Sequence, residues 1–63
     1  MCESTVILDL GDHEEEVMAD VVKVITQGNS IICINITGDT KELTDVMIFQ
    51  VDSLKHNIIL KKK

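Results

Sequence analysis

Four side chains in this sequence carry a thiol or an imidazole, groups that bind transition-metal ions and can act as nucleophiles: Cys2, His13, Cys33 and His56. A cysteine thiolate is a soft ligand that suits late first-row transition metals, and imidazole binds several of the same ions. Their spacing matches no metal-binding motif, because the chain contains no CxxC pair and no HxxxH pair. The residues alone therefore predict no complete metal site within one chain.

Cys2 has two interpretations at this level. It is either a thiol at a frayed chain end or a metal ligand. Position 2 adds a backbone amide to the thiolate, and an α-amino group if Met1 is removed, and such sulfur and nitrogen donors suit square-planar Ni(II). A four-sulfur zinc site is not available from one chain. The residues leave the two interpretations open.

The other three side chains favour structural roles. Cys33 lies within an apolar run and is predicted to be a small buried apolar residue. His13 stands among acidic residues, where a solvated turn is expected. His56 stands in the turn-like segment 55–57, where we expect a side-chain hydrogen bond to the backbone rather than a metal ligand, although the second role remains an alternative.

The sequence lacks the motifs of common enzyme classes. It contains no Gly-rich phosphate loop and no Ser-His-Asp set. An acidic cluster is present, but catalysis by paired carboxylates needs a pocket, and a chain of this size offers few. The cluster is predicted to be a solvated face, and it consists of Asp12, Glu14, Glu15 and Glu16. We therefore expect a protein that is not an enzyme.

Length and composition bound the class of protein. The 63 residues predict one small domain, residues 1–63, and a chain of this size buries only about 60% of its unfolded surface. With two cysteines and no secretory signal, we expect the cytoplasm rather than a disulfide-stabilised secreted protein. The hydrophobic content of 44% favours oligomerisation as the source of added stability.

The net charge of −5 argues against binding to nucleic acid, which requires cationic surface. Phe49 is the only aromatic residue, so no stacking platform for bases is present. The basic run 61–63 is predicted to be a flexible solvated tail. No apolar run approaches the roughly 20 residues that cross a bilayer.

Periodicity predicts strands over residues 4–10, 31–37 and 58–60, with turns at the glycines between them. Two segments are ambiguous. Residues 12–28 have apolar spacing typical of a helix, yet they are rich in β-branched valine, and as a strand they would need a kink near Asp20. Residues 41–54 pose the same choice, and a strand through Gln50 would need a bulge.

Two architectures follow from these elements: a small antiparallel β-barrel, or a β-α-β-α-β domain with parallel strands. Ile, Val and Thr make up much of the chain, and this composition favours the barrel. The two ambiguous segments supply only just enough residues for parallel connections. The barrel is the preferred prediction.

Over nearly all of its length, the chain resembles the CooT-type small nickel-binding proteins, which are linked to nickel delivery for carbon monoxide dehydrogenase. The matching segments are Met1-Cys2, Thr5-Val6-Ile7-Leu8, Val17-Met18-Ala19-Asp20-Val21, Gly38-Asp39-Thr40-Lys41 and Val51-Asp52-Ser53-Leu54-Lys55-His56-Asn57-Ile58-Ile59-Leu60. Each motif is weak by itself, and the specificity lies in their combination and order.

The resemblance implies a five- to seven-stranded antiparallel SH3-like or Sm-like barrel, a homodimer, and Ni(II) held through Cys2 of each chain. It implies a metallochaperone-like role in supplying nickel to an enzyme such as carbon monoxide dehydrogenase. Two features depart from the family pattern: Cys33 is an additional thiol, and residues 46–50 are unusually apolar, so that Met47 and Phe49 could face a larger interface. The competing hypothesis is an Sm-like RNA-binding or protein-interaction module.

Overall fold

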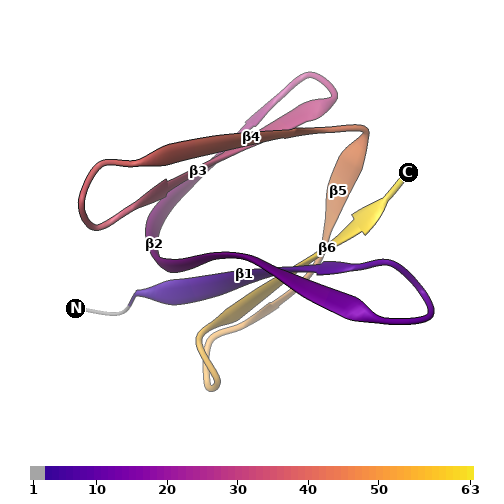
Figure 1. Ribbon diagram of the computed structural model, residues 1–63, viewed down its shortest axis with the longest axis horizontal. Helices are drawn as coiled ribbons and strands as arrows, with labels where there is room; N and C mark the ends of the chain where they lie inside the picture. The colour runs from indigo at the N-terminus through magenta and orange to yellow at the C-terminus, as the bar shows by residue number, and fades with distance from the viewer. Residues whose placement is uncertain (1–2) are drawn as a thin grey trace.

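The computed structural model describes residues 3–63, and within this range it contains β-strands and no helix (Figure 1). The strands are β1 (Ser4–Asp9), β2 (Glu14–Gln27), β3 (Ser30–Asn35), β4 (Thr40–Thr44), β5 (Val46–Asp52) and β6 (Asn57–Lys62). The all-β prediction is confirmed, and the β-α-β-α-β alternative is wrong. In the described part of the chain there is likewise no helix that could cross a membrane.

The six strands form one curled sheet in the order β4-β3-β2-β1-β6-β5. Figure 1 shows the sheet bending round on itself, although it does not close into a barrel. Neighbouring strands are antiparallel except for β1 and β6, which are parallel. The sheet is therefore mixed rather than purely antiparallel, because the four strands between β1 and β6 provide a connection long enough for parallel pairing.

Strand β2 explains why residues 12–28 have the apolar spacing of a helix. Its pairing with β1 and β3 contains register shifts, and Asp20 adopts a positive φ of 57° at the bend. Each irregularity changes which residues face inward. Val17, Val21 and Val24 consequently all pack on the core, although their spacing is not that of a regular strand. The kink expected near Asp20 is present.

Strand β5 contains the bulge that the sequence requires. Its pairing with β6 shifts between Ile48 and Gln50, which leaves Phe49 as the extra residue. Asp45, with a φ of 59°, separates β5 from β4 and redirects the chain.

The core lies on the inner face of the curled sheet. Its buried side chains come from β1, β2, β3, β5 and β6, and they are Val6, Leu8, Val21, Ile31, Cys33, Val46 and Leu60. The strand predicted over residues 31–37 is present as β3, which ends at Asn35, and its side chains alternate: Ile31 and Cys33 face inward, while Ile32 and Ile34 are only half-buried. Burial of these apolar groups is the main stabilising term.

The last strand extends further than the sequence predicts. Lys61 and Lys62 belong to β6 rather than to a solvated tail. The backbone N–H of Lys63 donates a hydrogen bond to the Asp45 carbonyl oxygen at 3.0 Å, and its Nζ donates one to Asn29 Oδ1 at 2.7 Å. Pairing with neighbouring backbone holds this segment despite its three positive charges.

Candidate metal centre

Strand β1, which begins two residues after Cys2, lies in the middle of the sheet. Cys2, the predicted ligand, lies outside the described residues, which begin at Glu3. Strand β1 begins at Ser4 and is flanked on one side by β2 and on the other by β6. The backbone N–H of Thr5 donates a hydrogen bond to the carbonyl oxygen of His56 at 2.9 Å. A ligand ahead of β1 would thus be joined in sequence to one of the two central strands of the sheet.

The turn between β5 and β6 lies beside the beginning of β1. Asp52 Oδ1 accepts hydrogen bonds from the backbone N–H groups of Leu54 and Lys55, each at 3.1 Å. His56 closes the turn with a positive φ of 57° and through its backbone carbonyl. The predicted hydrogen bond from its imidazole to the backbone is not among the interactions of residues 3–63.

Cys33 is fully buried in the core, which confirms its prediction as a small apolar residue. Burial raises the pKa of its thiol, and the positive charge of Lys41 on the paired position of β4 lowers it by less. Because the thiolate and not the thiol binds metals, this environment disfavours metal binding by Cys33.

His13 and the acidic cluster are solvated, as predicted. His13 is exposed between β1 and β2, with Nδ1 2.8 Å from Asp12 Oδ1 and Nε2 3.5 Å from Glu15 Oε2. Asp12, Glu14, Glu15 and Glu16 are all exposed. No three histidine, cysteine or acidic side chains of the described residues converge on a common point where a metal ion could sit.

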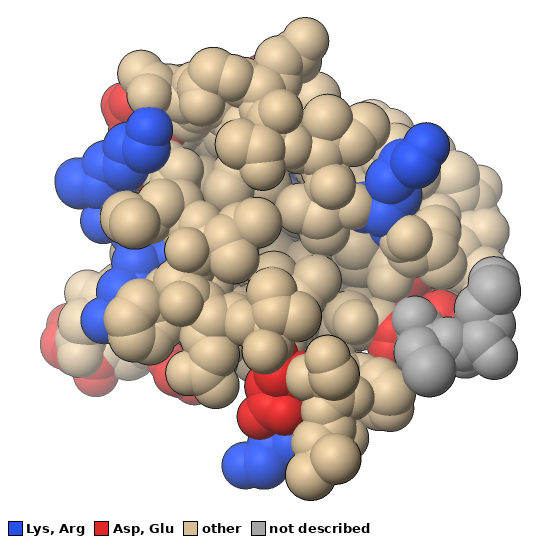
Figure 2. Space-filling model, turned by 180° about the vertical axis from the view of Figure 1, so that it is seen from behind, with Lys and Arg blue, Asp and Glu red and all other residues tan. Residues whose placement is uncertain are grey.

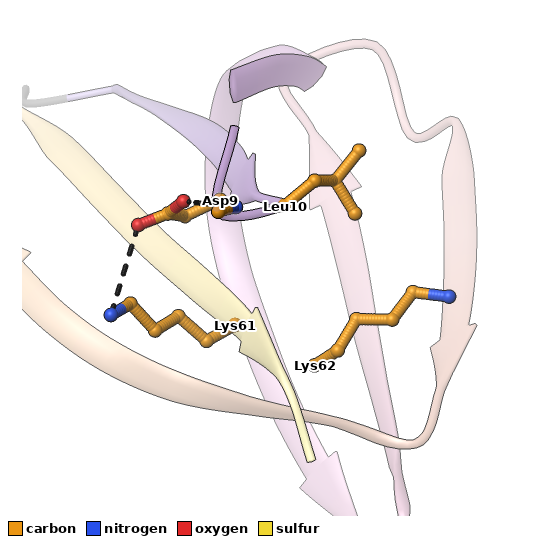
Figure 3. Close-up of a pocket in the computed structure, with 5 residues that line it drawn as sticks. Asp9, Leu10, Lys61 and Lys62 are labelled. Carbon is orange, nitrogen blue, oxygen red and sulfur yellow. Dashed lines mark hydrogen bonds and ion pairs between the residues drawn. The ribbon is translucent and has the colours of Figure 1, made fainter. Parts of the chain in front are cut away.

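A cavity of about 300 Å³ lies where the end of β1 meets the end of β6 (Figure 3). It is lined by Asp9, Leu10, Gly11, Lys61 and Lys62. Lys61 Nζ lies 3.8 Å from Asp9 Oδ2 and 4.0 Å from the centre of the Phe49 ring. Two ammonium groups beside one paired carboxylate repel a divalent cation, so this cavity is unsuited to nickel.

Strand β5 exposes a row of large apolar side chains. The exposed fractions are 47% for Met47, 39% for Ile48, 55% for Phe49 and 60% for Val51. No charged residue interrupts positions 46–51. Figure 2 shows one face of the molecule with a broad middle free of Lys, Arg, Asp and Glu, and with charged side chains of both signs around its margin. Clustered exposed apolar side chains of this kind are typical of interaction surfaces.

Comparison with known families identifies the chain. The family model described as CO dehydrogenase accessory protein CooT matches residues 1–61. The protein belongs to the CooT family. The crystal structure of a protein assigned as CooT from Carboxydothermus hydrogenoformans is similar to this chain with a TM-score of 0.89 and 27% sequence identity, over 98% of each chain. No protein with a curated description matches.

The CooT fold therefore places the predicted residues in three separate regions. His56 lies beside the beginning of β1, Cys33 lies in the core, and His13 lies beyond the other end of β1. The closeness of Thr5 and His56 was not predicted from sequence, because it follows from the parallel pairing of β1 with β6. The apolar run 58–60 indicates a strand but carries no signal for its partner or direction.

Proposed function

We propose that this CooT protein is a homodimeric, cytoplasmic nickel-binding protein without enzymatic activity. In this proposal Cys2 of each chain binds Ni(II) as cargo, and the protein aids nickel delivery to CO dehydrogenase. The observation that carries the proposal is the family match over residues 1–61, because the matched family consists of accessory proteins of that enzyme. The segment matched includes Cys2.

The distribution of thiols supports Cys2 as the ligand. The sequence has two cysteines, and Cys33 is buried in the core with a raised thiol pKa. One thiolate is a poor site by itself, and a twofold axis would supply a second copy of the same ligand. The anchoring of β1 at the centre of the sheet gives such a pair a rigid support on each chain.

The apolar row on β5 supports association of two chains. Residues Met47 and Phe49 are both about half exposed, and the strand around them carries no charge. Two chains of net charge −5 repel each other, so an interface is favoured where charged residues are few. The alternative of an RNA-binding module is not supported, since the negative charge and the single aromatic residue oppose it.

A nickel titration followed by absorption spectroscopy tests the proposal. Wild-type protein is expected to develop a thiolate-to-nickel charge-transfer band that saturates at one Ni(II) per two chains. Cys2→Ser should lose the band, whereas the matched variant Cys33→Ala should keep it. A band that persists in Cys2→Ser, or that disappears only in Cys33→Ala, would refute Cys2 as the ligand.

A further inference from the structure

Strands β4 and β5 are the two edge strands of the sheet, and they differ in how their edges are protected. Edge strands of soluble proteins are commonly guarded by charged side chains, because their unpaired backbone N–H and C=O groups otherwise attract another strand. Strand β4 carries Lys41 and Glu42 among its five residues. In β5, residues 46–51 carry no charge. The edge of β5 is therefore open to strand pairing, although the bulge at Phe49 bends it.

Part of the core-facing side of β5 is left uncovered. Residues directly opposite each other in two paired strands point to the same face of a sheet. Ile48 lies opposite the buried Leu60. Val51 lies opposite Ile58, which packs against the core. Ile48 and Val51 thus face the core side, yet they are 39% and 60% exposed, because the sheet does not close beside β5 and no further strand of residues 3–63 covers them.

The edge of β5 is separate from the side chains that support association of two chains. Met47 lies opposite Lys61, and Lys61 Nζ lies 4.0 Å from the centre of the Phe49 ring. Met47 and Phe49 are therefore on the outer face of the sheet. Backbone hydrogen bonds of an edge strand run in the plane of the sheet. Packing of two copies through the outer face consequently leaves the β5 edge free.

Charge is divided unevenly between the β5–β6 hairpin and the rest of the chain. Residues 46–63 contain four lysines and one acidic residue, a formal charge of +3. Residues 1–45 contain two lysines and ten acidic residues, a formal charge of −8. Lys55 and Lys62 form no ion pair within residues 3–63. The hairpin with the open edge therefore attracts groups of negative charge.

The chemistry of the edge selects among three kinds of partner. A lipid surface offers negative charge, but its hydrocarbon provides no hydrogen-bond partners for backbone groups. A second copy of β5 offers backbone partners but brings lysines of the same sign. An extended acidic segment of another protein offers both the backbone partners and the complementary charge.

We propose that β5 is a docking edge for an extended, acidic segment of a partner protein, which adds to the sheet as a further strand. In this mode of recognition, backbone hydrogen bonds give affinity and alternate side chains give specificity. Apolar side chains of the segment would pack on Ile48 and Val51. Its carboxylates would lie near Lys62, which is opposite the first residue of β5, and near Lys55, which follows the end of β5. The inference does not depend on nickel binding.

Nuclear magnetic resonance of the backbone amides tests this inference with a designed peptide. The probe has the seven-residue length of β5 and alternates valine with glutamate. One matched peptide has lysine in place of glutamate, and another has proline in place of the central valine. The valine–glutamate peptide should shift the β5 amide signals and slow their exchange with solvent, whereas the β4 signals stay unchanged. The two matched peptides should produce no such response.

Charge reversal on the protein gives a second readout. Lys62→Glu should weaken binding of the valine–glutamate peptide about threefold or more, because an attraction at the surface is replaced by a repulsion. Lys41→Glu is the matched control, since it changes the net charge equally but lies on β4 at the opposite edge. This variant should bind the peptide as wild type does.

Each alternative partner has its own outcome. Protection of the β5 amides that rises with protein concentration in the absence of peptide would assign the edge to a second copy and overturn the inference. Binding to phosphatidylglycerol vesicles without a response to the peptide would assign the hairpin to a lipid surface and overturn it as well.

Three further results would also contradict a docking edge on β5: shifts outside β5, equal binding of the proline peptide, or equal weakening by Lys41→Glu. If Lys62→Glu fails to fold, the wild-type spectra still decide. The nickel titration is a separate measurement, so the proposed function can stand or fall independently of this inference.

Discussion

Leu8 and Leu60 lie directly opposite each other in the parallel ladder of β1 and β6, and both are buried. This pair joins the strand that follows the candidate metal ligand to the last strand of the chain. A protein of this size has about 3–9 kcal/mol of stability in total. Interior contacts between the two strands are therefore a large part of what holds β1 and β6 together.

Leu60→Ala is expected to lower the free energy of unfolding by about 2–5 kcal/mol, because Leu60 is fully buried and its truncation leaves a cavity. Urea unfolding followed by circular dichroism measures the change. The matched control is Val51→Ala on the neighbouring strand, where the side chain is 60% exposed and a loss below about 1 kcal/mol is expected. Equal losses in the two variants would contradict the placement of the core.

Cys33 should make stability fall at alkaline pH. Burial raises the pKa of its thiol, so the folded protein retains the proton at a pH where an unfolded cysteine, with a pKa of about 8.5, has lost it. Its contribution is complete below that pH and declines as the pH rises through the folded pKa. The difference between the urea unfolding midpoints at about pH 7 and about pH 10 should be smaller in Cys33→Ala than in wild type. An identical decline in the two proteins would show that Cys33 is not the cause.

Asn35 organises the turn between β3 and β4. Its Oδ1 accepts hydrogen bonds from the backbone N–H groups of Thr37 and Asp39, at 3.2 and 2.9 Å, and from Thr37 Oγ1 at 2.9 Å. Asn35→Ala should cost about 1–2 kcal/mol, because several donors lose their partner at once. Thr37→Val removes only one of these donors and should cost less. The reverse order in a denaturant series would argue against this network.

Phe49→Ser is expected to weaken self-association at least about tenfold, since it removes an apolar side chain from the exposed row on β5. Sedimentation velocity over a range of protein concentrations measures the effect. Ile36→Ser is the control, because Ile36 is equally exposed, at 56%, but lies outside β5. Dissociation by Ile36→Ser and not by Phe49→Ser would place the interface elsewhere.

Particular residues show how much of this fold the sequence predicts. The turns at Gly11, Gly28 and Gly38 and the alternation of Ile31 with Cys33 were predictable, because glycine and strand periodicity act locally. Whether residues 12–28 form a helix or a strand was not predictable from their spacing. The register shifts in β2 bring Val17, Val21 and Val24 inward, and the spacing of these three residues resembles that of a helix. Periodicity favoured a helix here and the β-branched residue types a strand, so the residues left the choice open, and the family resemblance is what indicated the strand that the structure contains.

The candidate site was predictable only in part. Cys2 was selected through a resemblance and stays a prediction, because it lies outside the described residues. His56 was interpreted as a turn residue, which its backbone confirms. The sequence around His56 does not indicate that this turn lies beside the beginning of β1. Pairing between Thr5 and Asn57 joins segments from opposite ends of the sequence, and no short-range pattern reports it.

The parallel pairing of β1 with β6 also bears on the order in which the sheet can assemble during synthesis. Strand β1 leaves the ribosome first, yet one of its two partners is the last strand to be made. Contacts between such distant segments form late and slow the folding of small β-proteins. In a nascent chain β1 therefore lacks its β6 partner until the segment through Lys62 has been synthesised, and the sheet cannot be complete before that point.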